Sequence, residues 1–142
     1  MFSPRVKGPR YFRERVPAAI VQEWNSKCSL HVVAQAELLP LVLARMTWFH
    51  LLQGAWSIYL IDNDSVKAAL VSGNTKSLAS MELLALAAKF EIQLEAFSWY
   101  SRVPSPSNIS DEPSRLSFKF IESFDSSCMD RPKWPVMYEK YR

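Results

Sequence analysis

The chain has 142 residues, 49% of them hydrophobic, which suffices for one domain with a buried core. The formal net charge is only +3, and two cysteines, Cys28 and Cys128, form no CxxC pair, so neither a disulfide framework nor a zinc site is indicated. The first ten residues lack the apolar core of a secretory signal, and the most apolar stretch, AELLPLVLARMTWFHLL, holds a proline and three ionisable side chains. We therefore expect an intracellular protein, cytoplasmic or nuclear, without a membrane span.

The N-terminal segment is basic. Residues 4–15 carry five basic side chains against a single acid, Glu14. The alternation in PRYFRERVP (9–17) predicts a strand that ends at Pro17. A basic strip can attract phosphate, and it is equally typical of an ordinary edge strand guarded by charge. The candidates for contact with nucleic acid on this strand are Arg10, Arg13 and Arg15.

Two helices are predicted in the first half of the chain. AAIVQEWNSK (18–27) has an apolar face at helical spacing. LHVVAQ (30–35) is interpreted as a brief extended segment. A second helix is expected from about Glu37 to Leu52, with Pro40 in its first turn, where no intrahelical N–H bond is lost.

WSIYLID (56–62) is the best strand in the chain, because it is short, β-branched and aromatic. It runs directly into Asp62 and Asp64, with Asn63 between them. The helix VKAALVSG follows at once, and we expect Asp64 or Ser65 to cap it.

The second half continues the alternation of helix and strand. LASMELLALAAKFEIQL (78–94) is rich in Ala and Leu and predicts a long helix, and LEAFSWYSRV (94–103) predicts another strand. VPSPSNISDEPSR is a Pro/Ser loop. Strands alternating with helices favour an α/β sheet with at least one parallel pair. Residues 117–142 have no clear period, and their aromatic side chains either cover part of the sheet or have no role.

Three acids are expected to converge at one rim of this sheet. Asp62 ends the 56–62 strand, Glu37 opens the helix before it, and Asp111 follows the 94–103 strand and its loop. Carboxylates brought together need a cation, and oxygen ligands suit magnesium or manganese. Each acid also has an ordinary interpretation: Glu37 complements its helix dipole, Asp111 is an N-cap, and Asp62 starts a turn. Spacing alone does not decide between the two.

Three stretches in order, HVVAQAELLPLVLA, LIDNDSVKAAL and RVPSPSNISDEPSRL, resemble the ribonuclease H domain attached to retroelement reverse transcriptases. The likeness covers about residues 10–116, and three motifs in register are fairly specific. It implies a ribonuclease H-like mixed sheet with flanking helices and the first strand missing. The ribonuclease H-like domain would span residues 1–116, followed by an aromatic and basic C-terminal tail at 117–142.

The resemblance also implies an activity, hydrolysis of the RNA strand of an RNA–DNA hybrid with Mg²⁺ or Mn²⁺. In the parent polyprotein the domain would be joined to a reverse transcriptase. The resemblance assigns catalytic and metal-binding roles to three acids of this chain. They are Glu37, which matches the family's glutamate, Asp62, which matches its aspartate before asparagine, and Asp111, which matches the acid of its Asn-x-x-Asp-x-x-Ser-Arg motif. Asp64 is the alternative to Asp62. Two metals about 4 Å apart would activate water and stabilise the leaving oxygen. The expected contacts with the nucleic-acid backbone are Arg10, Arg13, Arg15, Asn63, Arg102 and Asn108.

One part of the family pattern is missing from this sequence. The family's first strand supplies a fourth carboxylate, and neither Glu14 nor Glu23, the acids ahead of Glu37, matches it. We therefore expect a chain that begins inside the second strand and has little or no nuclease activity. Two alternatives stay open: a catalytically dead remnant that binds nucleic acid weakly, and a plain protein-interaction domain whose acids are caps and turns.

Overall fold

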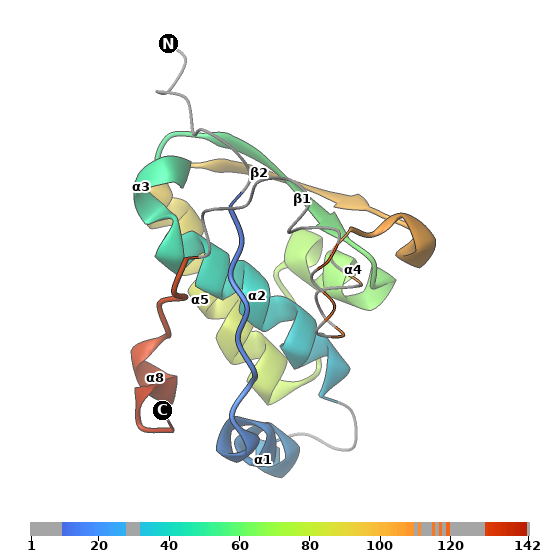
Figure 1. Cartoon of the computed structure of the whole chain (residues 1–142), viewed down its shortest axis with the longest axis vertical. Coiled ribbons are helices and arrows are strands. Elements are labelled where there is room, and N and C mark those ends of the chain that lie inside the picture. Colours follow the sequence, from blue (N-terminus) through green and yellow to red (C-terminus); the bar gives the residue numbers. More distant parts are fainter. Residues whose placement is uncertain are drawn as a thin grey trace.

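In a computed structural model of the chain, the described residues are 10–27, 32–109, 111, 115, 117, 119 and 130–141, so both cysteines lie outside them. The elements in chain order are α1 (Ala18–Lys27), α2 (Val33–Thr47), α3 (Phe49–Leu52), β1 (Trp56–Ile61), α4 (Asp64–Ser72), α5 (Leu78–Leu94), β2 (Phe97–Arg102), the 3-10 turn η1 (Ser105–Ser107) and α8 (Val136–Glu139). The helices α2, α4 and α5 lie on one side of the two strands, and α1 lies at the far end from the sheet (Figure 1). Among the described residues, no helix has the length and apolar composition needed to cross a bilayer.

The two strands form a parallel pair, which confirms the mixed α/β class and the predicted parallel pairing. Trp56 pairs with Phe97 at one end of the register and Ile61 with Arg102 at the other. Because parallel strands need a crossover connection, α4 and α5 supply it, in the order that the alternation of patterns predicted. The finer ribonuclease H-like assignment stays a proposal.

The strand predicted at 9–17 is wrong for the residues that the structure describes. Residues 10–17 are irregular except for a single bridge residue, Tyr11, whose carbonyl accepts a hydrogen bond from the Asp130 amide at 2.8 Å. The segment runs along α2 (Figure 1), and the Phe12 ring lies 5.2 Å from the Trp48 ring. Phe12 and Val16 pack against the core, whereas the three charged residues between them are exposed, so the segment packs on the helices without pairing as a strand.

The second helix differs from its prediction at both ends. It starts at Val33 rather than near Glu37, so the extended segment expected at 30–35 is helical from Val33 onward. Pro40 therefore lies inside the helix, on the exposed side, rather than in its first turn. Two valines suggested extended backbone, but burial of a helical face overrides local propensity. The helix ends at Thr47, and Trp48 separates it from the single-turn α3.

Helices α1 and α5 match their predicted positions, α4 starts two residues earlier than VKAALVSG, and α8 was not predicted. α1 covers 18–27 and α5 covers 78–94, as expected. α4 starts at Asp64, and its N-cap is Asn63 rather than Asp64 or Ser65. It ends at Gly73, whose φ of +67° is in the left-handed region that favours glycine.

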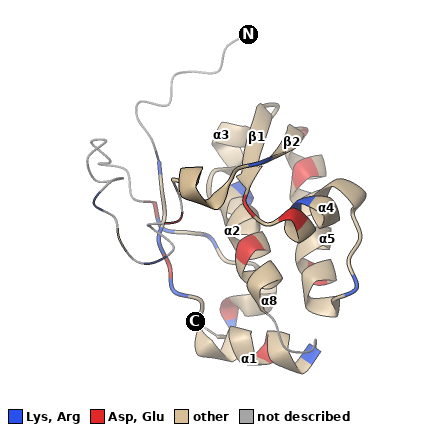
Figure 2. Cartoon of the chain, turned by 90° about the vertical axis from the view of Figure 1, so that its right-hand side faces the viewer, with Lys and Arg blue, Asp and Glu red and all other residues tan. Residues whose placement is uncertain are grey.

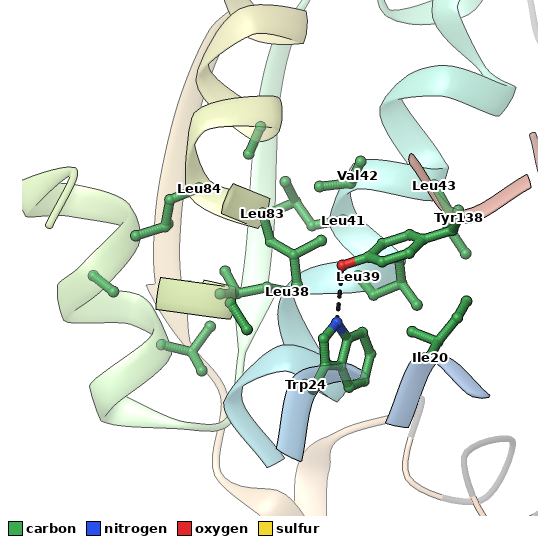
Figure 3. Close-up of a cluster of buried hydrophobic side chains, with 14 of the residues drawn as sticks. Ile20, Trp24, Leu38, Leu39, Leu41, Val42, Leu43, Leu83, Leu84 and Tyr138 are labelled. Carbon is green, nitrogen blue, oxygen red and sulfur yellow. Dashed lines mark hydrogen bonds between the residues drawn. The ribbon is translucent and has the colours of Figure 1, made fainter. Parts of the chain in front are cut away.

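The hydrophobic core lies among α1, α2, α4, α5 and the C-terminal residues around Trp134 and Tyr138 (Figure 3). Trp24 of α1 donates a hydrogen bond from Nε1 to Tyr138 Oη at 2.8 Å, inside a cluster of leucines. Trp134 is 4% exposed and belongs to the same cluster. These two C-terminal aromatics, Trp134 and Tyr138, thus pack in the helical core. The expected boundary at residue 116 stays a prediction, and the aromatics at 118, 120 and 124 lie outside the described residues.

Arg45 joins the helices to the inner face of the sheet. It is 1% exposed, and its guanidinium donates to the Ala87 carbonyl, to Ser98 Oγ at 2.8 Å and to Tyr100 Oη at 2.7 Å. It also forms an ion pair with Glu91 at 3.3 Å. A buried guanidinium is tolerated only when its donors are satisfied in this way. The network fixes α2, α5 and β2 relative to one another.

Candidate functional site

Glu37 of α2 and Asp62, the residue that follows β1, lie beside each other, and we call them the carboxylate pair. Burial raises the pKa of Glu37 above its ordinary value, and a hydrogen bond from Asn63 opposes this. The Asp62 carboxylate raises the same pKa further, through its charge and by accepting a hydrogen bond from protonated Glu37. The acidic segments of α2 and of the turn after β1 lie close together in Figure 2. Two of the three predicted acids therefore meet.

Asn63 holds Glu37 in this position. Its Oδ1 accepts hydrogen bonds from the Ser65 and Val66 amides, at 2.9 and 3.2 Å. Because the oxygen must face those N–H groups, Nδ2 is directed to Glu37 Oε1, to which it donates over 3.3 Å. Glu37 Oε2 is buried, and while Glu37 is ionised this oxygen has no hydrogen-bond donor among the described residues. That buried acceptor is the part of the site that a cation would satisfy.

The loop after β2 reaches the same place. Asn108 donates from Nδ2 to Asp62 Oδ2 at 3.1 Å, and its carbonyl accepts a hydrogen bond from the Asp111 amide at 3.0 Å. The Asp111 carboxylate forms an ion pair with Arg115 at 3.2 Å. Ser114 of the same motif lies outside the described residues. All three motifs thus meet at the carboxyl end of β1, linked through two asparagines.

Asp111 does not complete a set of three ligands. Within the described part of the chain, no group of three or more histidine, cysteine or carboxylate side chains has a geometry that could hold a metal ion. Metal binding by Asp111 stays a prediction, whereas Glu37 and Asp62 are adjacent. Asp64, the alternative to Asp62, is largely exposed and pairs with Arg102 at 3.3 Å. Because Asp64 pairs with Arg102, Asp62 is the acid of this turn that lies beside Glu37.

Two of the expected nucleic-acid contacts are engaged with acids. Arg10 lies 3.2 Å from both Asp130 carboxylate oxygens, and Arg102 holds Asp64. The side chains of Arg13 and Arg15 are exposed. These contacts partly neutralise the positive charge that the sequence places here. Binding of nucleic acid by these residues stays a prediction.

Two structural roles were not predicted from the sequence. Asn63 was expected to contact nucleic acid, and the cap of α4 was given to Asp64 or Ser65, although an asparagine before Asp-Ser-Val is a common N-cap arrangement. Arg45 received no role, although a lone cation inside an apolar helical stretch signals a buried charge that needs partners.

Comparison with protein-family models, with curated proteins and with solved structures found no match to this chain.

Proposed function

We propose that the chain is a ribonuclease H-like domain derived from a retroelement reverse transcriptase, and that its carboxylate pair binds one divalent cation. The observation that carries the proposal is the meeting of Glu37 and Asp62, which come from separate elements. Asn63 donates a hydrogen bond to Glu37, and Asn108 donates one to Asp62. This is the rim where α/β sheets gather their reactive groups. The interaction-domain alternative expects scattered acids, and the adjacency of these two supports the first function.

The carboxylate pair fits Mg²⁺ or Mn²⁺. Mg²⁺ is commonly held by one or two carboxylates, with water and substrate phosphates completing its coordination. While Glu37 is ionised, its buried Oε2 has no hydrogen-bond donor among the described residues, and the neighbouring Asp62 charge disfavours ionisation of Glu37. A bound cation relieves both the unsatisfied oxygen and the repulsion between the two carboxylates, because Glu37 Oε2 coordinates it and its charge neutralises the pair. When bound, it would supply Lewis-acid chemistry at a phosphate.

The chain's own residues would position the reactants. Asn63 and Asn108 orient the carboxylates, and the exposed Arg102 beside them is placed to meet a backbone phosphate. Recognition of an RNA–DNA hybrid would rest on phosphates and 2′-hydroxyls. We expect weak or no hydrolysis by this polypeptide, because neither acid ahead of Glu37 matches the fourth carboxylate: Glu23 pairs with Lys27 at 2.7 Å, and Glu14 is exposed.

Binding of a labelled RNA–DNA hybrid, measured by fluorescence anisotropy in Mg²⁺ and in chelator, tests this function. We expect Mg²⁺ to strengthen hybrid binding by the wild type, with a preference over duplex DNA of the same sequence. The Asp62→Asn variant should lose the Mg²⁺ effect, and the matched variant Asp64→Asn should retain it. Equal binding of both duplexes, or a Mg²⁺ effect that survives Asp62→Asn, would overturn the proposal.

The same samples report cleavage. Little product is expected from the wild type on a denaturing gel. Strong cleavage that Asp62→Asn abolishes would keep the ribonuclease assignment but refute the expected loss of activity, because another group would then supply the fourth carboxylate.

A further inference from the structure

The face of the sheet turned away from the helices is apolar and exposed. Alternate residues of paired strands point to the same side, so the register places one set of side chains outward. The other set includes Tyr59 and Tyr100, which contact the buried Arg45. The outward set, which we call the outer sheet face, consists of Trp56 (85% exposed), Ile58 (72%), Leu60 (59%), Phe97 (62%) and Trp99 (70%).

This face is larger than the apolar patches that monomers usually expose. Large aromatic side chains present roughly 150–250 Å² each, so with these exposed fractions the five residues leave about 700 Å² uncovered. The largest patch on a typical monomer is about 300–600 Å². Each partner of a stable protein complex buries about 800 Å². The outer sheet face therefore has the size of one side of a stable interface.

The chemistry of the face favours another copy of itself. None of its five side chains is charged, and the sixth outward position is Ser101, so nothing on it selects a partner of opposite charge. A flat apolar sheet is matched in shape by a second such sheet, and stacked sheets interdigitate about 10 Å apart. Parallel strands are usually covered on both faces, and the helices in the described part of the chain cover only one face of this pair.

The face is also organised before binding. The Trp56 and Phe97 rings stack across the strands, with centroids 5.1 Å apart and an angle of 28° between the planes. Rings already packed against each other lose little freedom on association, and aromatic residues are enriched in the cores of interfaces. Ile58 and Trp99 are paired in the middle of the register. They mark the centre of the face.

We propose that two copies of this chain associate face to face through the outer sheet face, with Ile58 and Trp99 close to the two-fold axis. The two sheets form the middle of the dimer, and the helices of each copy lie outside them. An isologous contact of this kind repeats each interaction twice. The dimer is independent of the carboxylate pair, so either proposal can fail without the other.

Light scattering coupled to size-exclusion chromatography tests the dimer at micromolar concentrations, where interfaces of this size associate. The wild type should elute at twice the monomer mass of 16.3 kDa. Ile58→Lys and Trp99→Lys place like charges at the axis and should elute as monomers. Ile92→Lys, at an equally exposed apolar site on α5, is the control and should remain dimeric. A monomeric wild type, or loss of the dimer in the control alone, would overturn the proposal.

Tryptophan quenching tests the same face without substitution. The chain has five tryptophans. Trp24 and Trp134 are buried, whereas Trp56 and Trp99 are exposed on the outer sheet face. Quenching of the wild type by iodide should fall as chain concentration rises, and this result stands even if the lysine variants fail to fold. Quenching that is independent of concentration would contradict the dimer, and protection by zwitterionic lipid vesicles alone would reassign the face to a membrane surface.

Discussion

Asn63 donates a hydrogen bond to Glu37 over 3.3 Å while its side-chain oxygen caps α4. One side-chain amide therefore sets both the start of α4 and the position of the half-buried Glu37 carboxylate. It links the local structure of the β1–α4 turn to the chemistry at the end of the sheet.

The double role of Asn63 gives the first prediction. Asn63→Ala removes the N-cap and the donor to Glu37, and we expect a loss of about 1–2 kcal/mol in the free energy of unfolding. Asn63→Ser keeps an N-cap oxygen and loses only the donor to Glu37, so it should cost less. Urea denaturation measures both. Equal losses in the two variants would show that the cap contributes nothing.

The raised pKa of Glu37 predicts how stability depends on pH. The folded state holds the Glu37 proton more tightly than the unfolded state, so stability falls as pH rises from roughly pH 4, the ordinary carboxylate range. Glu37→Gln cannot ionise, and it should become more stable than the wild type toward neutral pH. Urea midpoints between acidic and neutral pH measure the difference. A wild type that gains stability over Glu37→Gln with rising pH would contradict the assigned direction.

Buried Arg45 predicts a large loss on truncation. Arg45→Met removes the guanidinium that donates to the Ala87 carbonyl and to two tyrosine hydroxyls, and it breaks the ion pair with Glu91. We expect a cost of about 3–5 kcal/mol. Arg131→Met removes an exposed arginine and should cost less than about 0.5 kcal/mol. Thermal and urea unfolding compare the two. Similar stabilities for both variants would mean that the network does not hold the sheet on the helices.

The hydrogen bond between Tyr138 of α8 and Trp24 of α1 predicts that the C-terminal helix stabilises the core. Tyr138→Phe removes the hydroxyl that accepts the hydrogen bond from the buried Trp24 Nε1, at a cost of about 1–3 kcal/mol. Tyr11→Phe, in the 10–17 segment, is the control and should change stability little. The contrast can be read from denaturation followed by tryptophan fluorescence. If Tyr138→Phe were as stable as the wild type, the hydrogen bond would not link α8 to α1.

Much of the fold could be predicted where one local signal dominates. The Ala- and Leu-rich composition of 78–94 and the β-branched, aromatic stretch at 56–62 each favour one structure, and both lie where expected. The segment 9–17 alternates like a strand, but the conformation of its described residues depends on packing against Trp48, which the sequence spacing does not reveal. Val33 is β-branched and exposed yet starts a helix, because burial of Gln35 and Leu38 further along the same helix outweighs its own preference for extended backbone.

The site was predictable to the same degree. The order of the motifs predicted that Glu37 and Asp62 would lie together, and they do, although Glu37 lies about one turn inside α2 rather than at its start. The ion pair between Asp111 and Arg115 depends on a side-chain direction in a loop, which no spacing encodes. Asn63 and Asp64 are adjacent, so only the backbone geometry shows which of them caps α4.

Binding of Mn²⁺ to the carboxylate pair tests the central claim most directly, by electron paramagnetic resonance of free Mn²⁺ titrated with the chain at neutral pH. The wild type should bind one ion per chain, Glu37→Gln and Asp62→Asn should each weaken binding at least tenfold, and Asp64→Asn should match the wild type. No binding by the wild type, or equal binding by Asp62→Asn, would contradict the account.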